Sequence, residues 1–137
     1  MVGFTEAHNE VRRPLGLTDL SWDESVAVVA QAYAEKLASE NCAFYHSMHP
    51  DYGENLYWSQ GFMPTSQDVT AAWASEVQFY DYESNSCQPG EQCGHYTQIV
   101  WATTERLGCG MAHCADNAEV WVCNYDPPGN WVGQRPY

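Results

Sequence analysis

The sequence predicts an α+β domain, with helices in the first half and an antiparallel β-hairpin near the end. Three observations support this fold class. An apolar stripe with helical spacing follows Ser21, two segments with strand character flank residues 114–118, and the number of cysteines is even, at six. A chain of 137 residues suits one domain, so we expect residues 1–137 to form a single unit.

Three helices are predicted, over residues 5–13, 21–41 and 65–80. The first is expected to start at Thr5 and to end before Pro14. The second has the clearest signals, because Ser21 and Glu24 have the spacing of a capping box. Its apolar stripe comprises Val26, Val29, Ala30, Tyr33 and Leu37. The third is capped by Thr65 or by the serine that follows it.

The remaining segments carry turn and strand signals. Residues 43–64 are rich in His, Gly, Pro and aromatic residues, which predicts a long ordered loop. Residues 95–104 fit a helix or a strand equally well. Strands are predicted at residues 106–112 and 119–124, joined by the turn at 114–118. The Pro- and Gly-rich tail from residue 127 onward is expected to be extended.

The charge of the chain restricts its partners. Eighteen acidic residues against five basic ones give a net charge of −13, which argues against nucleic acid and against electrostatic attachment to anionic lipid. No apolar run approaches the ~20 residues of a transmembrane helix. We therefore expect no transmembrane segment and no nucleic-acid partner, and a ligand that is neutral, apolar or cationic. The protein is expected to be a monomer.

The cysteines indicate the compartment. None of the six forms a CxxC pair, which argues against a zinc knuckle and against thioredoxin-like chemistry. An even set of cysteines is typical of disulfides, here three, in a secreted, extracellular protein. Residues 1–4 show no leader, so we expect a mature chain from which a signal peptide has been removed.

Histidines and glutamates provide the candidate chemistry. Glu76 shares a predicted helical face with Trp73, where a carboxylate is costly unless it is paired or reaches solvent at the edge of the face. His46 precedes Glu54 by eight residues, and His95 lies in a separate segment. Histidine near carboxylates suits metal binding, acid–base catalysis or a structural hydrogen bond. The residues themselves leave these alternatives open.

Two long motifs then carry a family resemblance. Residues 94–101, GHYTQIVW, and residues 123–131, CNYDPPGNW, resemble the two signature motifs of the CAP superfamily. This superfamily contains cysteine-rich secretory proteins, antigen 5 and pathogenesis-related class 1 proteins. Residues 132–137, VGQRPY, are most similar to the plant-type pathogenesis-related class 1 branch. The resemblance implies a three-layer α-β-α sandwich around a small antiparallel sheet, and a role in defence or host interaction.

The resemblance also implies a cleft that contains two histidines and two glutamates. By motif these are His46, Glu54, Glu76 and His95. Similar proteins hold Zn²⁺ or another divalent cation through the two histidines, so His46 and His95 are the predicted metal ligands. A metal-activated water beside the glutamates would make the four residues catalytic candidates, and a metal-dependent hydrolase is the alternative activity. A second alternative is a hydrogen-bonded network that only braces the cleft.

Relatives of this family also bind sterols or fatty acids, through apolar grooves and an aromatic loop. The matching loop here is residues 57–64, with Tyr57, Trp58, Phe62 and Met63 as the candidate lipid contacts. The alternative is that these side chains only pack the loop onto the body. In plant relatives a C-terminal peptide acts as an elicitor, and residues 127–137 match it. We predict binding of a sterol-like lipid, with the hydrolase and the peptide precursor as alternatives.

The disulfide pairs follow from the predicted hairpin. Cys109 and Cys123 lie seven residues before and after Asp116, so they would face each other across an antiparallel ladder. Cys87 and Cys93 close a local loop, and two cysteines are left for the third bond. The family pattern agrees with this scheme. The predicted pairs are Cys109–Cys123, Cys87–Cys93 and Cys42–Cys114.

Overall fold

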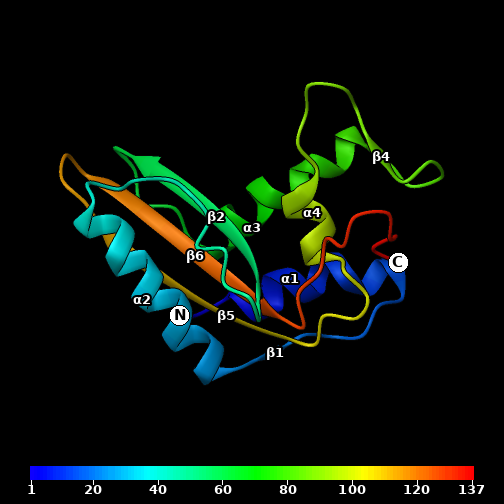
Figure 1. Cartoon of the computed structure of the whole chain (residues 1–137), viewed down its shortest axis with the longest axis horizontal. Coiled ribbons are helices and arrows are strands. Elements are labelled where there is room, and N and C mark those ends of the chain that lie inside the picture. The colour runs from blue at the N-terminus through cyan, green and yellow to red at the C-terminus, as the bar shows by residue number, and fades with distance from the viewer.

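An antiparallel hairpin forms the centre of the sheet. In the computed structural model, which describes residues 1–137, all residues of β5 (Arg106–His113) pair with residues of β6 (Ala118–Asp126). β2 (Gly53–Gln60) pairs antiparallel with β6, and the short β1 (Ser21–Trp22) pairs parallel with β5. The strand order is therefore β1–β5–β6–β2 (Figure 1).

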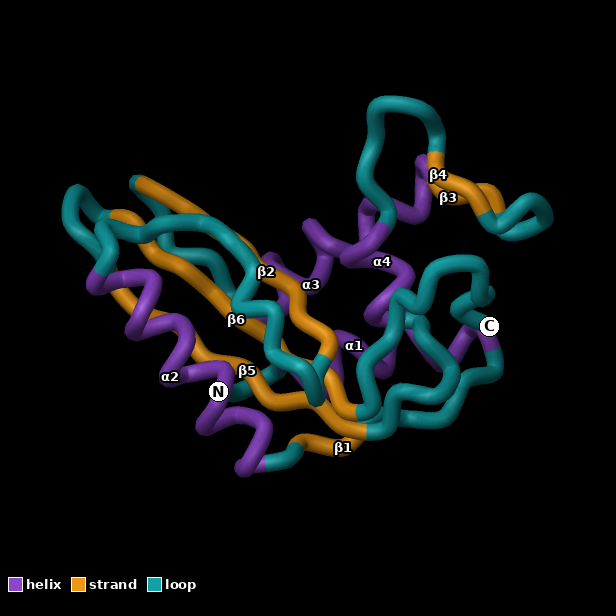
Figure 2. The backbone as a smooth tube through the Cα atoms, in the orientation of Figure 1, coloured by secondary structure: helices purple, strands orange, loops and turns teal.

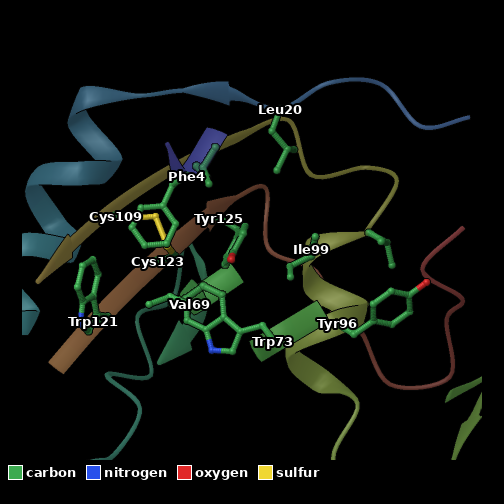
Figure 3. Close-up of a cluster of buried hydrophobic side chains, with 12 residues drawn as sticks. Phe4, Leu20, Val69, Trp73, Tyr96, Ile99, Cys109, Trp121, Cys123 and Tyr125 are labelled. Carbon is green, nitrogen blue, oxygen red and sulfur yellow. A yellow bond between two sulfur atoms is a disulfide. The ribbon is translucent and has the colours of Figure 1, made fainter. Parts of the chain in front are cut away.

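Helices cover both faces of this sheet. The element α2 (Glu24–Ser39) lies on one face, and α1 (Phe4–Arg12), α3 (Ser66–Ala74) and α4 (Gly94–Ile99) lie on the other (Figure 1). Successive side chains of β6 point to opposite faces of the sheet, as in any β-strand. Val120 and Val122 pack under α2, whereas Trp121 and Cys123 join the larger apolar cluster (Figure 3). The predicted α+β class with a small antiparallel sheet is confirmed.

Short elements connect these layers. The 3₁₀ helices η1 (Arg13–Leu15) and η2 (Ser75–Phe79) extend α1 and α3. The strands β3 (Tyr80–Asp81) and β4 (Ser86–Cys87) form a small ladder that projects from the body (Figure 2). None of the helices combines the length and the apolar character that a bilayer span needs.

The prediction of a continuous loop over residues 43–64 was wrong. Its second half contains β2, whose eight residues all pair with β6. Gly53 and Asn55 are poor strand formers and mask the local pattern, so this strand is specified by its distant partner. Tyr57 and Trp58 consequently lie on a strand, and the loop that carries Phe62 and Met63 begins only at residue 61.

Helix starts and ends also differ from the predicted ones. Ser21 belongs to β1, and Asp23 caps α2 by accepting a hydrogen bond from the Val26 amide at 3.1 Å. The first helix starts at Phe4, after Gly3 at φ 96°, and has no side-chain cap. The third keeps α geometry only to residue 74. Thr65 does cap that helix, in a capping box with Asp68.

Three disulfides fasten the outer segments to this framework. The structure contains the three expected pairs, Cys42–Cys114, Cys87–Cys93 and Cys109–Cys123. The first ties the segment after α2 to the turn of the hairpin. The second holds the loop that leads into α4, and the third crosses the β5–β6 ladder at directly opposed residues.

Two polar side chains of α1 are fully buried. The guanidinium of Arg12 donates only to backbone carbonyls, those of Thr18 at 2.9 Å, Ile99 at 2.9 Å and Trp101 at 2.8 Å, with Thr104 at 3.5 Å. His8 donates from Nδ1 to the Phe4 carbonyl at 2.8 Å. Burial lowers the pKa of His8 from 6.5 to about 4.

The lowered pKa of His8 predicts a loss of stability in mild acid. The folded state keeps this ring neutral, so its contribution is complete above about pH 6.5 and is lost as the pH falls from 6.5 towards 4. The free energy of unfolding should fall by about 3 kcal/mol across this window because of His8. Urea unfolding of the wild type and of His8→Gln at several pH values measures it. If the free energy of unfolding falls equally steeply with pH in the two proteins between pH 6.5 and 4, His8 is not the cause of the loss.

Candidate functional site: a histidine–glutamate cleft and an adjoining apolar groove

The four predicted site residues form two histidine–glutamate pairs. His46 donates from Nδ1 to Glu54 Oε1 at 2.9 Å, and His95 donates from Nδ1 to Glu76 Oε2 at 2.6 Å. His46, Glu54 and His95 line one polar cleft of about 270 Å³. Glu76 does not line this cleft and reaches it through His95. The structure thus brings the two pairs to one place.

Glu54 anchors the loop that carries the first histidine. It lies on β2, and its carboxylate accepts hydrogen bonds from the Ser47 amide at 2.9 Å and the Ser47 hydroxyl at 2.5 Å, besides the one from His46. Burial raises the pKa of Glu54, but the hydrogen bonds from His46 and Ser47 outweigh it, and the resulting pKa lies below the ordinary value. The hydrogen bond between His46 and Glu54 also raises the pKa of His46 above its ordinary value.

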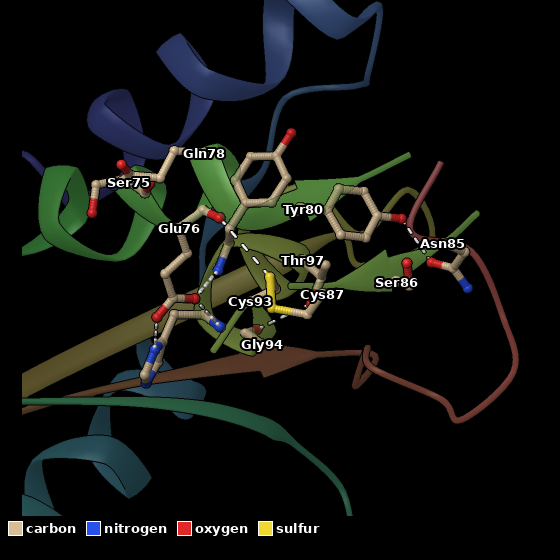
Figure 4. Close-up of a disulfide and its surroundings, with 12 residues drawn as sticks. Ser75, Glu76, Gln78, Tyr80, Asn85, Ser86, Cys87, Cys93, Gly94 and Thr97 are labelled. Atoms are coloured by element: carbon tan, nitrogen blue, oxygen red, sulfur yellow. Dashed lines mark hydrogen bonds and ion pairs between the residues drawn. A yellow bond between two sulfur atoms is a disulfide. The ribbon is translucent and has the colours of Figure 1, made fainter. Parts of the chain in front are cut away.

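Glu76 anchors the second histidine at the start of α4. Its carboxylate accepts from the amides of His95 at 2.9 Å and Tyr96 at 3.1 Å (Figure 4). These amides are among the donors that a helix leaves unsatisfied at its N-terminus, where negative charge is also favoured. The Glu76 side chain is only 15% exposed. This carboxylate is therefore paired, which is one of the two alternatives expected from its apolar helical face.

The two pairs leave the same atom of each imidazole free. Because Nδ1 of His46 and of His95 donates to a carboxylate, Nε2 is the atom left with a lone pair. A carboxylate on the far side of the ring is the usual support of a metal-binding histidine. The structure contains no group of three His, Cys, Asp or Glu side chains that could hold a metal ion. From these residue types, the cleft provides two imidazoles as candidate metal ligands.

An apolar groove of about 690 Å³ adjoins the cleft. Trp73 of α3 lines the groove, and its indole donates to the Leu56 carbonyl of β2 at 3.0 Å and stacks on His95 with 6.1 Å between ring centroids. Trp58 and Phe44, which are 45% and 56% exposed, also line the groove. The segment after α2 that carries Phe44 runs back beside β2 (Figure 2). His95 borders both the groove and the cleft.

The candidate lipid contacts divide into two groups. Tyr57 and Trp58 line the groove, but Phe62 and Met63 do not, and they are 55% and 78% exposed. Sequence reasoning missed Phe44 as a groove residue, because its position after a helix gives no periodic signal. Trp73 was noted only as a neighbour of Glu76 on a helical face, and that face turns out to border the groove.

A hydrolase could use a serine nucleophile, and two serines, Ser47 and Ser75, are neighbours in sequence of His46 and Glu76. The hydroxyl of Ser47 donates to Glu54, and that of Ser75 donates to the Ala72 carbonyl. A serine nucleophile is ordinarily activated by a hydrogen bond to a base such as histidine. Neither hydroxyl is hydrogen-bonded to His46 or His95 in the structure.

The C-terminal segment 127–137 is hydrogen-bonded to the body at several points. Thr104 donates to the Pro127 carbonyl at 2.8 Å, and the Ala102 amide donates to the Pro136 carbonyl at 2.7 Å. Arg135 donates to backbone carbonyls of the β3–β4 region. Release of this segment as a peptide would have to break these contacts as well as the chain.

Comparison with known proteins agrees with this geometry. A model of the cysteine-rich secretory protein (CAP) family matches residues 5–125. Pathogenesis-related protein 1A of Nicotiana tabacum is 45% identical over 134 residues, which cover 98% of this chain and 79% of that protein. Venom allergen-like protein 4 of Schistosoma mansoni is 29% identical, with a TM-score of 0.76 over 98% of this chain and 90% of that one. The structure of NaASP2 with Zn²⁺ has a TM-score of 0.77 at 26% identity, over 98% and 82% of the two chains. The chain therefore belongs to the CAP family, in its plant-type pathogenesis-related class 1 branch.

Proposed function

We propose that this protein is secreted and acts in defence or host interaction by binding a sterol-like lipid in the groove beside the histidine cleft. Membership of the pathogenesis-related class 1 branch supports the biological setting, and three disulfides suit an extracellular protein. The main support for a sterol-like lipid as the ligand is the apolar groove.

The size and the lining of the groove support a mostly apolar ligand. Its volume of about 690 Å³ falls in the range of ~300–1,000 Å³ typical of small-molecule sites. Aromatic side chains line the groove, while Glu76 and His95 at its border supply polar groups for a single hydroxyl or carbonyl. The net charge of −13 disfavours an anionic headgroup, so a neutral lipid fits best.

We also propose that His46 and His95 hold a divalent cation such as Zn²⁺ through their Nε2 atoms. The carboxylate behind each ring supports this assignment. The similar structure of NaASP2 with Zn²⁺ favours zinc among the divalent ions. A cation at this place would supply a Lewis acid where the cleft meets the groove.

Replacing Trp58 with alanine is expected to weaken sterol binding about tenfold, because a half-exposed aromatic side chain contributes about 1–2 kcal/mol when a ligand covers it. The melting temperature should change little. A fluorescent-sterol titration measures the affinity. Trp131→Ala is the matched control, since Trp131 is 54% exposed and does not line the groove.

The Phe62→Ala variant tests whether the ligand binds in the groove or on the loop after β2. Phe62 lies outside the groove, so its removal should leave sterol affinity within about twofold of the wild type. A large loss in Phe62→Ala together with normal binding by Trp58→Ala would place the ligand on the loop and contradict the proposed site.

A further inference from the structure

We propose that the side-chain oxygen of Asn55 is a third ligand for the cation in the cleft, and that the buried pair His8 and Tyr125 fixes its orientation. This inference rests on the two-histidine metal site proposed above. Asn55 lies on β2 directly after Glu54, is 1% exposed, and lines the same cleft as His46 and His95.

The hydrogen bonds of Asn55 determine which end of its amide points inward. Nδ2 lies 3.1 Å from the His95 carbonyl oxygen and 3.2 Å from the Tyr125 hydroxyl. Because a carbonyl oxygen can only accept, the group facing it must be the NH₂. Both amide hydrogens are therefore directed into the protein. Oδ1 accepts no hydrogen bond from the chain and is the end left for the cleft.

A buried relay behind Asn55 enforces this orientation. His8 must donate from Nδ1 to the Phe4 carbonyl, so its Nε2 accepts, and the Tyr125 hydroxyl 2.7 Å away is the donor. The oxygen of Tyr125 is then free to accept from Asn55. Burial keeps His8 neutral by lowering its pKa to about 4, and both His8 and Tyr125 are 0% exposed. Turning the Asn55 amide over would set its oxygen against the carbonyl of His95.

The other side-chain amide and carboxylate groups of the cleft are already engaged, except that of Gln92, which makes no hydrogen bond and is exposed. The Glu54 carboxylate accepts from His46 and Ser47. Asn130 uses both ends of its amide, accepting from the Thr97 hydroxyl and donating to the Gly94 carbonyl. Asn55 is thus the buried cleft residue with an unpartnered acceptor.

An amide oxygen beside two imidazoles is a reasonable donor set for a divalent cation. Three protein ligands with further positions open is the arrangement of catalytic rather than structural zinc sites. An oxygen ligand also widens the choice to harder cations than an all-nitrogen set would accept.

Zn²⁺ titration calorimetry on the full chain tests the inference. We expect Asn55→Leu to weaken Zn²⁺ binding at least tenfold and Tyr125→Phe, which keeps the ligand but loosens its orientation, to weaken it several-fold. Asn130→Leu is the matched control, since that amide lines the same cleft with both ends engaged, and its affinity should stay within about twofold of the wild type. In the wild type, the side-chain amide ¹⁵N resonance of Asn55 should shift on addition of Zn²⁺.

The outcomes distinguish the inference from the metal site itself. Wild-type protein that binds no Zn²⁺ overturns both. Loss of binding in His46→Ala/His95→Ala with full binding by Asn55→Leu overturns the role of Asn55 and leaves the two-histidine site standing. If Asn55→Leu fails to fold, the resonance decides, because an Asn55 amide signal that does not move on saturation with Zn²⁺ overturns the inference.

Discussion

Replacing Arg12 with methionine should lower the free energy of unfolding by about 3–5 kcal/mol. The guanidinium is fully buried and closes the end of α4 by donating to the carbonyls of Ile99 and Trp101, besides that of Thr18. Methionine fills much of the space but leaves the carbonyls of Thr18 and Ile99 without a donor, while that of Trp101 keeps only the Thr104 amide. Each carbonyl that is left unpaired and that water cannot reach costs about 1–3 kcal/mol. Since domains of this size are stable by ~5–15 kcal/mol, the loss is a large fraction of the total.

The neighbouring residue provides the control for this prediction. Arg13 is exposed and pairs with Glu6 at 2.7 Å and with Asp19 at 2.8 Å on the surface. Surface ion pairs contribute little, so Arg13→Met should unfold at nearly the wild-type urea concentration. Comparable losses in the two variants, or a normal midpoint for Arg12→Met, would show that the buried guanidinium is not what holds α4 in place.

The double variant His46→Ala/His95→Ala is expected to lose Zn²⁺ binding by more than about 100-fold, because it removes both of the proposed nitrogen ligands. The fold should persist, since the two side chains are 54% and 23% exposed. Calorimetry at neutral pH measures the loss. His113→Ala, at the exposed end of β5, is the control. Unchanged affinity in the double variant would remove both histidines from the site.

The same site should bind Zn²⁺ more weakly as the pH falls. A histidine must be neutral to bind a metal ion. The hydrogen bond to Glu54 raises the pKa of His46 above its ordinary 6.5. Protons should therefore begin to compete with the metal at a pH above 6.5. Wild-type calorimetry at pH 7.5 and pH 5.5 measures the effect, and equal affinities at the two pH values would contradict it.

The parts of the fold with local signals could be predicted from the sequence. The β5–β6 hairpin could be predicted because residues of strand character flank a turn, and the symmetric positions of Cys109 and Cys123 indicate its register. The strand β2 could not be predicted. Its sequence mixes Gly53 and Asn55 with aromatic residues, and only pairing with β6, more than fifty residues later, makes it a strand.

The site shows the same division between local and long-range information. The histidine–glutamate residues could be identified because they lie in motifs, and Glu76 also through its place on an apolar helical face. The groove joins Phe44, Trp58 and Trp73 from three separate segments, and no sequence pattern relates them. The orientation of Asn55 depends on His8 and Tyr125, which lie at opposite ends of the chain.

Mass spectrometry of the lipids that co-purify with the native protein tests the central proposal most directly. We expect a neutral sterol at close to one molecule per chain, strongly reduced in Trp58→Ala and retained in Trp131→Ala. A native protein whose groove carries no lipid, even when zinc occupies the histidine cleft, would contradict lipid binding as its function.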